Sequence, residues 1–370
     1  MTLLAFRNLF QNKARFVISV GGVALALMLI LSLDAIFTGM ERRVTAYIDQ
    51  SGADIFVSQS GVRNMHMASS WLAASAQADV EAVSGVESAT PILYITNMIV
   101  IGDERNLAYI IGLPEDSEAG GAWKVTAGRG QPEPGETVID RGVAEKSGAA
   151  PGDEVEILGR KFEIVGLSEG TASLVNSVAF ISMDDFAALR GNPDSVSFLL
   201  VKVKPGDSAE SVAARIESEV NDVTAQSTTE FAVQERKVIK DMSTDVIAMM
   251  NIIGFLIGLA VMALTVYTAT FARRAEYGVL KALGARNGHL YRAVLMQAFI
   301  SVALGFALGL IFTLAVSAVA PRLSLTLALE VSGASLIKVG AVSLIIGGLA
   351  AVLPIRQIAG LDPAMVFRGK

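Results

Sequence analysis

Residues 273–285, with the sequence RRAEYGVLKALGA, form a short charged segment between two long apolar runs, 246–271 and 293–320. Each run exceeds the ~20 residues that a helix needs to cross the ~30 Å hydrocarbon core of a bilayer. The loop that joins two such spans lies at one membrane surface. Residues 272–292 contain five basic side chains and one acidic side chain, a bias that is typical of the cytoplasmic side. We therefore expect a cytoplasmic loop.

Two further apolar runs of sufficient length, 16–37 and 334–353, complete a predicted set of four spans. Basic residues cluster before the first run, in 7–15, and after the last run, in 356–370. The positive-inside rule then places both termini in the cytoplasm and the chain between the first two spans outside.

The chain around the first run raises two objections to this topology. Arg42 and Arg43 would lie outside, against the rule, although Glu41 partly offsets them. The first run could also be a cleaved signal peptide. Its length of about 22 residues exceeds the 7–15 of a secretory signal, however, and no clear small-x-small cleavage site follows it. We therefore expect a transmembrane helix at 16–37.

The distribution of charge separates a membrane part from a water-soluble part. Hydrophobic residues make up 52% of the chain, and its mean hydropathy of +0.52 excludes an ordinary soluble protein. Residues 41–245 nevertheless hold 32 of the 36 acidic and 17 of the 30 basic residues. This segment is long enough to bury its own core, which no disulfide can stabilise because the chain has no cysteine.

The acidic segment has the pattern of an α+β domain. Residues 137–140 are typical of a strand, and the helix formers of 142–147 are followed by Gly148, which is placed to end that helix. The alternation in 154–158 and the apolar run 162–165 predict a β-hairpin. The predicted fold class is thus a membrane protein with four transmembrane α-helices, one before and three after a large α+β extracytoplasmic domain.

We expect this outer domain to have two lobes. One would contain the strands of residues 85–180, and the other a β–helix unit at 195–225. Residues 230–245 have the composition of a polar helix that runs straight into the second span. This helix is predicted to act as a stalk.

Two glycine pairs predict close helix packing in the membrane. Gly254 and Gly258 lie in the second span, and Gly305 and Gly309 lie in the third. A four-residue spacing lets helix backbones approach each other in lipid, although glycine is also simply common in membrane helices. Because four spans are few for a transport path, we expect a homodimer with eight.

The sequence offers no energy source within the chain. It contains no G-x-x-x-x-G-K-[ST], G-x-S-x-G or H-E-x-x-H motif, and its two histidines, His66 and His289, are assigned to opposite membrane faces. We therefore expect no catalytic residue and no metal site. The spans hold few charges; Asp34, near the outer end of the first, is expected to face interfacial water.

One cluster of possible ligand residues remains in the outer segment. Met65, His66 and Met67 are consecutive, and imidazole and thioether groups both bind iron in haem proteins. The alternative is a methionine-rich apolar loop that packs against the outer domain or the membrane surface. These three residues are a candidate substrate site.

The order of one span, a large outer domain and three spans resembles the permease subunit of MacB/FtsX-type (type VII) ABC transporters. Three segments carry the resemblance. Residues 274–284 (RAEYGVLKALG) are similar to the family's loop between its second and third spans, and 138–166 (VIDRGVAEKSGAAPGDEVEILGRKFEIVG) to its periplasmic core domain. The ending 353–364 (LPIRQIAGLDPA) resembles its C-terminal tail. The layout is most similar to the DevC and HrtB branch.

This resemblance implies a separate ABC ATPase subunit that binds ATP and Mg²⁺, because no nucleotide-binding domain is fused to the chain. The loop would form a coupling helix that docks on the ATPase. The residues expected to take part are an apolar anchor of Tyr277, Leu280 and Leu283, a polar rim of Arg274, Glu276 and Lys281, and Gly284 at the end of the helix. The alternative is an amphipathic turn that rests on anionic lipid.

The resemblance implies an exporter permease that couples ATP binding and hydrolysis to movement of the outer domain, called mechanotransmission, and expels a hydrophobic or amphipathic substrate. One alternative is an FtsX-like regulator that activates an extracytoplasmic partner without moving cargo; a membrane-anchored enzyme is a weaker one. The expected location is a bacterial inner membrane. A membrane-fusion protein is a further expected partner, and nucleic acid is not.

These predictions divide the chain as follows: 1–15, cytoplasmic segment; 16–37, first span; 41–229, MacB-like core domain; 230–245, stalk; 246–271, second span; 272–292, coupling loop; 293–320, third span; 334–353, fourth span; 354–370, cytoplasmic tail.

Overall fold

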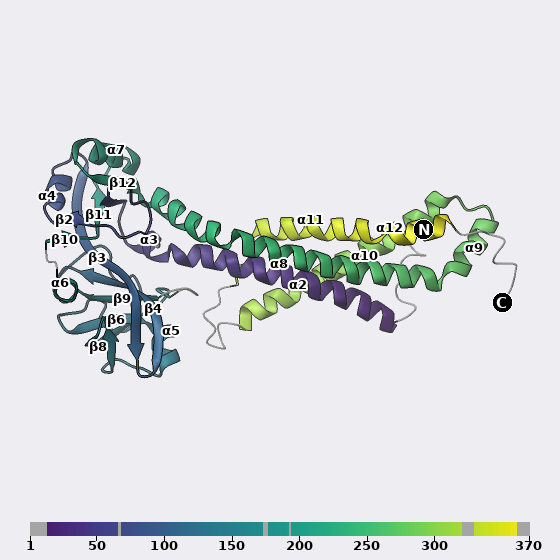
Figure 1. Cartoon of the computed structure of the whole chain (residues 1–370), viewed down its shortest axis with the longest axis horizontal. Helices are drawn as coiled ribbons and strands as arrows, with labels where there is room; N and C mark the ends of the chain where they lie inside the picture. The colour runs from purple at the N-terminus through teal and green to yellow at the C-terminus, as the bar shows by residue number, and fades with distance from the viewer. Residues whose placement is uncertain (1–12, 66–67, 173–176, 192–193, 320–328, 361–370) are drawn as a thin grey trace. The chain divides into compact units, whose positions relative to one another are not determined.

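The chain forms two compact units in the computed structural model (Figure 1). We call residues 39–243 the inserted domain and the other described residues the membrane unit. The structure describes residues 13–65, 68–172, 177–191, 194–319 and 329–360.

Four long helices make up the membrane unit. They are α2 (Lys13–Val44), α8 (Thr228–Ala272), α10 (Asn287–Val319) and α11 (Gly333–Ala350), which is followed by the short α12 (Val352–Ala359). Within the described residues, four helical stretches are long and apolar enough to cross a membrane, one before the inserted domain and three after it. The predicted fold class is confirmed. The fourth stretch continues through α12.

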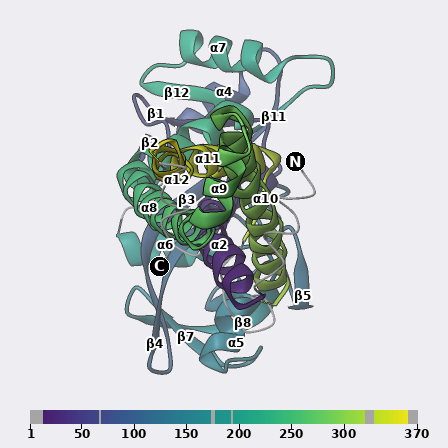
Figure 2. The same ribbon diagram turned by 90° about the vertical axis from the view of Figure 1, so that its right-hand side faces the viewer.

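Buried apolar side chains from all four long helices form one cluster in the membrane unit. It includes Leu27 of α2, Met262 of α8, Val302 of α10 and Ile346 of α11. Figure 2 shows these helices side by side. Since lipid tails are as apolar as leucine, close packing and not water exclusion holds such a bundle together.

A ten-stranded sheet, in the order β12-β1-β11-β3-β4-β9-β6-β8-β5 with β7 pairing β3 and β8, forms the centre of the inserted domain. A separate two-stranded sheet pairs β2 with β10. The strands are β1 (Ile55–Gln59), β2 (Leu72–Ala73), β3 (Val86–Ile101), β4 (Glu104–Leu113), β5 (Val125–Gly128), β6 (Glu136–Asp140), β7 (Glu154–Ile157), β8 (Arg160–Ser168), β9 (Ser177–Ser182), β10 (Ser195–Val196), β11 (Phe198–Val203) and β12 (Val223–Ser227).

Strand β3 is long enough to belong to both parts of the sheet. From Val86 to Ile92 it pairs antiparallel with β11, and from Leu93 to Ile101 it pairs antiparallel with β4. The two predicted lobes therefore share one continuous strand. The described residues of the inserted domain also form five short helices: α3 (Ala46–Gln50), α4 (Ala76–Glu81), α5 (Arg141–Ser147), α6 (Met183–Arg190) and α7 (Ala209–Glu219).

The local structure around α5 follows the sequence signals. The Asp140 side chain accepts a hydrogen bond from the Gly142 N–H at the start of the helix, and Gly148 ends it with a left-handed φ of 69°. Strands β7 and β8 form the predicted antiparallel hairpin. Its turn residues Leu158 and Gly159 both have positive φ, as a tight two-residue turn requires.

Helix α8 contains both the polar segment 230–245 and the second span in 45 continuous residues. Its first turns are part of the core of the inserted domain. The ring of Phe231 stacks on that of Phe56 with centroids 4.7 Å apart, and Glu235 is fully buried. No loop therefore separates the core of the inserted domain from the start of this helix.

Candidate functional site

The short helix α9 (Arg274–Ala282) lies between α8 and α10 and is the first candidate site. A break at Arg273 separates it from α8. At its other end Gly284 has a φ of 91°, a conformation that favours glycine, and the Ala285 N–H donates to the Leu280 carbonyl at 2.9 Å. The sequence thus fixes both ends of the helix.

One side of α9 exposes apolar side chains. Leu283 is 79% exposed, Leu280 37% and Val279 43%. Because α9 lies outside the four stretches that can cross a membrane, a lipid core does not account for this exposure. Exposed apolar patches of this kind mark sites of interaction.

Charged residues lie beside this apolar face at the start of α9. Glu276 is exposed, with its carboxylate 3.8 Å from the Arg273 guanidinium. The Arg274 guanidinium lies over the Phe271 ring, 4.6 Å from its centroid. Glu276 thus lies on the same side of α9 as Val279, Leu280 and Leu283, whereas the spacing of Arg274 places it on the side of Tyr277 and Lys281.

The opposite side of α9 faces the membrane unit, and two of the predicted docking residues lie there. Tyr277 is only 5% exposed and belongs to the same buried cluster as Ile358 of α12 and Leu290 of α10. Its burial raises the pKa of its hydroxyl. The prediction that Tyr277 is part of an exposed anchor is therefore wrong, because its ring packs inside the chain.

Lys281 also points away from the exposed face. Its Nζ donates to the backbone carbonyls of Ile358 at 3.0 Å and Ala359 at 3.1 Å. The expectation of a rim role for Lys281 is corrected in the same way. Val279, which was not among the predicted docking residues, lies on the exposed face. Its spacing of three residues from Glu276 and four from Leu283 indicates this position on the helix.

The four predicted packing glycines all lie at helix contacts. A Cβ on Gly305 would come 2.7 Å from Val23, and one on Gly309 would come 2.9 Å from the carbonyl oxygen of Ala24, so α10 meets the backbone of α2. A Cβ on Gly254 would come 2.7 Å from Ile30 of α2, and one on Gly258 would contact α11 and α2. Helix α2 is thus the common neighbour.

An ion pair joins α2 to α11. The Lys338 Nζ lies 2.5 Å from the Asp34 carboxylate, whose side chain is 13% exposed. Asp34 was expected to face interfacial water, and this expectation is corrected: it pairs with a lysine instead. No local pattern around Asp34 indicates its partner, which lies 304 residues away.

Met65, in the inserted domain, is buried and held at its backbone by two side chains. Its N–H donates to Oε2 of Glu235 at 2.8 Å, and its carbonyl accepts from the Tyr94 hydroxyl at 3.0 Å. Met65 belongs to the hydrophobic core, which corrects its prediction as an accessible ligand. His66 and Met67 lie outside the described residues.

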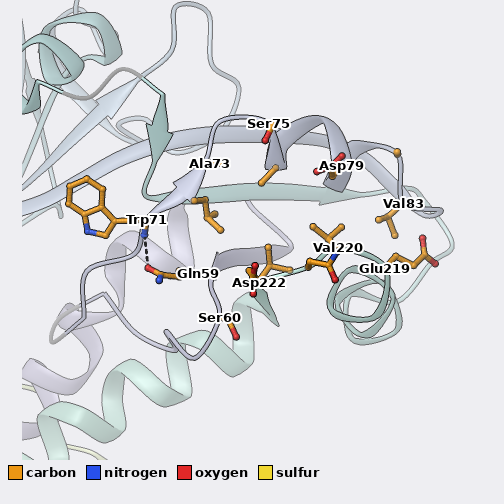
Figure 3. A pocket seen from close by; sticks show the side chains of 15 residues that line it. Gln59, Ser60, Trp71, Ala73, Ser75, Asp79, Val83, Glu219, Val220 and Asp222 are labelled. Carbon is orange, nitrogen blue, oxygen red and sulfur yellow. Dashed lines mark hydrogen bonds between the residues drawn. The ribbon is translucent and has the colours of Figure 1, made fainter.

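The inserted domain also contains a cavity of about 760 Å³ between α4 and the turn that joins α7 to β12. Figure 3 shows Asp79 on one side of it and Val220 and Asp222 on the other. Glu219 adds a third carboxylate, so the lining is acidic. Trp71 lies at one end, with the Arg190 guanidinium 3.4 Å from its ring centroid.

No group of three or more histidine, cysteine, aspartate or glutamate residues in the described part of the chain is arranged to hold a metal ion. Two candidate sites remain among the described residues. These are the exposed face of α9 in the membrane unit and the acidic cavity in the inserted domain.

Two family models together cover most of the chain. The model of the MacB-like periplasmic core domain matches residues 16–219, and that of the FtsX-like permease C-terminal domain matches residues 248–363. The first alone spans more than half of the sequence.

Relatives and solved structures resemble the chain at sequence identities of 25% or less. A Mycobacterium tuberculosis protein named as an uncharacterised ABC transporter permease is 25% identical, with all of both chains covered. One from Methanocaldococcus jannaschii with the same description is 21% identical, covering 99% of this chain and 97% of the relative. The periplasmic region of MacB from Actinobacillus actinomycetemcomitans is 17% identical over 50% of this chain and 94% of that one, with a TM-score of 0.38.

Proposed function

We propose, because the chain belongs to the MacB/FtsX-type family of ABC transporter permeases, that it is the permease of an exporter driven by a separate ATPase. As an ABC transporter permease it has an ABC ATPase as its partner. We expect ATP and Mg²⁺ to bind to that ATPase and not to this chain. The complex would contain two permeases and two ATPases in a bacterial inner membrane, with both permease termini in the cytoplasm.

The observation that carries the proposal is the two-sided character of α9. Its outer side exposes Leu280 and Leu283 outside the membrane spans, while its inner side is fixed by the buried Tyr277. A rigid helix with an apolar face and a charged rim fits a cleft on a partner protein. A flexible loop would lose conformational entropy on binding, which α9 has already lost on folding.

Helix α8 supports the next step of the proposal. It is one helix from Thr228, next to the core of the inserted domain, to Ala272, two residues before α9 begins. A displacement of α9 by the ATPase would therefore move a continuous helix, and the inserted domain would follow. This is the mechanotransmission that we propose.

The low content of charged residues in the described spans favours a cargo that does not cross as a hydrated solute. In the described spans the charged side chains Asp34 and Lys338 pair with each other. We propose a hydrophobic or amphipathic substrate that movement of the inserted domains expels. A membrane-fusion protein would then receive it.

The second candidate function is that of a regulator whose ATPase cycle activates an extracytoplasmic partner without moving cargo. The continuous helix α8 favours this function as well, because it can transmit movement to the inserted domain whether or not a cargo is moved. Substrate-stimulated ATP hydrolysis distinguishes the two functions. Substrate added to the purified complex stimulates ATP hydrolysis by an exporter and leaves that of a regulator unchanged.

The docking step is tested by co-purifying the permease with its ATPase. Replacement of both Leu280 and Leu283 by aspartate places charges in the apolar contact and should weaken binding at least about tenfold. The matched control replaces the same two leucines by methionine, which keeps the surface apolar. Normal complex formation by the aspartate variant would contradict docking through α9 and favour contact with lipid.

A further inference from the structure

The underside of α9 is attached to the last turn of α12. The Lys281 ammonium donates to the carbonyls of Ile358 and Ala359 at 3.0 and 3.1 Å. Ala359 is the last residue of α12, and carbonyls at a helix C-terminus have no partner within the helix. They also carry the negative end of the helix dipole, so a lysine is well suited to bind them.

Apolar packing strengthens this attachment. Tyr277 lies one helical turn before Lys281, and the two therefore share a face of α9. Tyr277 and Ile358 belong to one buried cluster, and Ile358 is fully buried. Both helices thus contribute a side chain to one apolar cluster, and the hydrogen bonds of Lys281 join them one turn further on.

Helix α12 in turn continues from the fourth span. Only Ala351 separates it from the end of α11, and this residue is fully buried. At its other end, α9 follows α8 after a break of one residue, Arg273. Helix α9 is therefore connected to α8 through the chain and to α11 through Lys281 and α12. Figure 1 shows α9 and α12 at the same end of the membrane unit.

We propose that Lys281 is a positioning residue that clamps α9 to α12, so that movement of α9 reaches α11 as well as α8 and α10, the two spans to which the chain joins it. The inference rests on the proposed function, in which α9 is the helix that the ATPase moves. Without the clamp, α9 would still bind the ATPase through its outer face. It would then act directly on α8 and α10 through the chain, and α11 would lose its connection to α9.

The test compares movement at the outer ends of the two spans in the complete complex. Because the native chain has no cysteine, single cysteines at Val246 of α8 and Ile337 of α11, both exposed, can be labelled specifically with a maleimide. Labelling rates are measured with and without a non-hydrolysable ATP analogue. In the otherwise native chain, we expect nucleotide to change the rate at both positions.

Lys281→Met keeps the apolar stem and removes the charge. It should bind the ATPase as the native chain does and keep the nucleotide response at position 246. The response at position 337 should fall about tenfold, the size expected when one charge-assisted hydrogen-bonded contact is lost. Lys281→Arg keeps a charged donor and should restore most of the response. An unchanged response at position 337 in Lys281→Met would overturn the proposal.

A second variant keeps the proposal testable if Lys281→Met fails to fold. In the variant Lys281→Cys/Ala359→Cys, a bifunctional maleimide joins α9 to α12, and position 337 is labelled afterwards. The unlinked variant should lack the nucleotide response at position 337, and the cross-link should restore it. A cross-linked protein without the response would also overturn the proposal. Loss of ATPase binding in the leucine variants alone reports on docking, and absence of any nucleotide response in the native chain contradicts the proposed function itself.

Discussion

Single buried residues determine how the inserted domain holds the start of α8. The Glu235 carboxylate accepts the Met65 N–H at 2.8 Å, and the Tyr94 hydroxyl binds the carbonyl of the same residue. Both backbone groups of Met65 are therefore satisfied by side chains from other elements. A buried backbone group is costly when it is left unpaired, so Glu235 connects α8 to the segment that precedes residues 66 and 67.

The first prediction concerns Glu235. Replacement by alanine leaves the Met65 N–H without this acceptor and should lower the free energy of unfolding by about 1–3 kcal/mol. Glu235→Gln keeps an acceptor oxygen and should cost less. Thermal unfolding of the purified chain in detergent measures both. Glu230→Ala, at an exposed position of the same helix, is the matched control. A glutamine variant less stable than the alanine variant would contradict this role.

The second prediction concerns Tyr47 and Tyr94, whose pKa values burial raises above 10. In the unfolded chain a tyrosine ionises near pH 10. The stability that these residues contribute is therefore complete below about pH 10 and is lost as the pH rises above it. Absorbance titration should show both rings ionising only as the inserted domain unfolds. Ionisation near pH 10 in the folded protein would count against their burial.

At the scale of elements, the glycines of α10 define how closely it packs against α2. Gly309 meets the backbone of α2 directly, whereas a Cβ on Gly340 of α11 would have no neighbour within 4 Å. The two positions differ in contact although both are glycines in membrane helices. The position of a glycine on its helix, and not the frequency of glycine in the helix, therefore decides whether it allows close helix packing.

The third prediction follows from this difference. Gly309→Ala should push α10 from α2 and lower the unfolding temperature in detergent, at a cost of about 1–3 kcal/mol. Gly340→Ala, the matched control, should leave the temperature unchanged or raise it slightly, because it adds a methyl group where space is open. Equal effects of the two substitutions would show that α10 and α2 are not in close contact.

Features that depend on local periodicity could be predicted from the sequence, whereas the side-chain partners of individual residues on distant segments could not. The four spans, the hairpin of β7 and β8 and the helix that Gly148 ends all follow from signals within a few residues. Tyr277 and Lys281 point inward because they pack against or bind α12, about 80 residues later in the chain. The partner of Asp34 lies on another span. The sequence of α9 therefore does not show which of its faces meets the rest of the chain.

In the whole molecule, the coupling that we propose requires α8 to act as a single element. Its 45 residues begin beside the buried Phe231 and end next to α9. The fourth prediction is that a break in this helix uncouples the two ends. A proline at Lys240 removes a helix hydrogen bond and kinks the chain. ATPase binding should persist, while nucleotide no longer affects the inserted domain.

The coupling of α8 is measured in the Lys240→Pro variant by the exchange of backbone amides in residues 55–65 with and without the ATP analogue. Lys240→Ala, which keeps the helix intact, is the control and should behave as the native chain does. A normal nucleotide response in the proline variant would show that movement reaches the inserted domain by another route.

We propose above that an ATPase bound to α9 moves the inserted domain. Hydrogen exchange of the complete complex tests it most directly, with the amides of residues 228–236 as the reporter. We predict that the ATP analogue changes their exchange in the native complex and leaves it unchanged when Leu280 and Leu283 are aspartate. The proposal would be contradicted if the ATP analogue did not change the exchange of these amides in the native complex, or if it changed the exchange equally in the native complex and the aspartate variant.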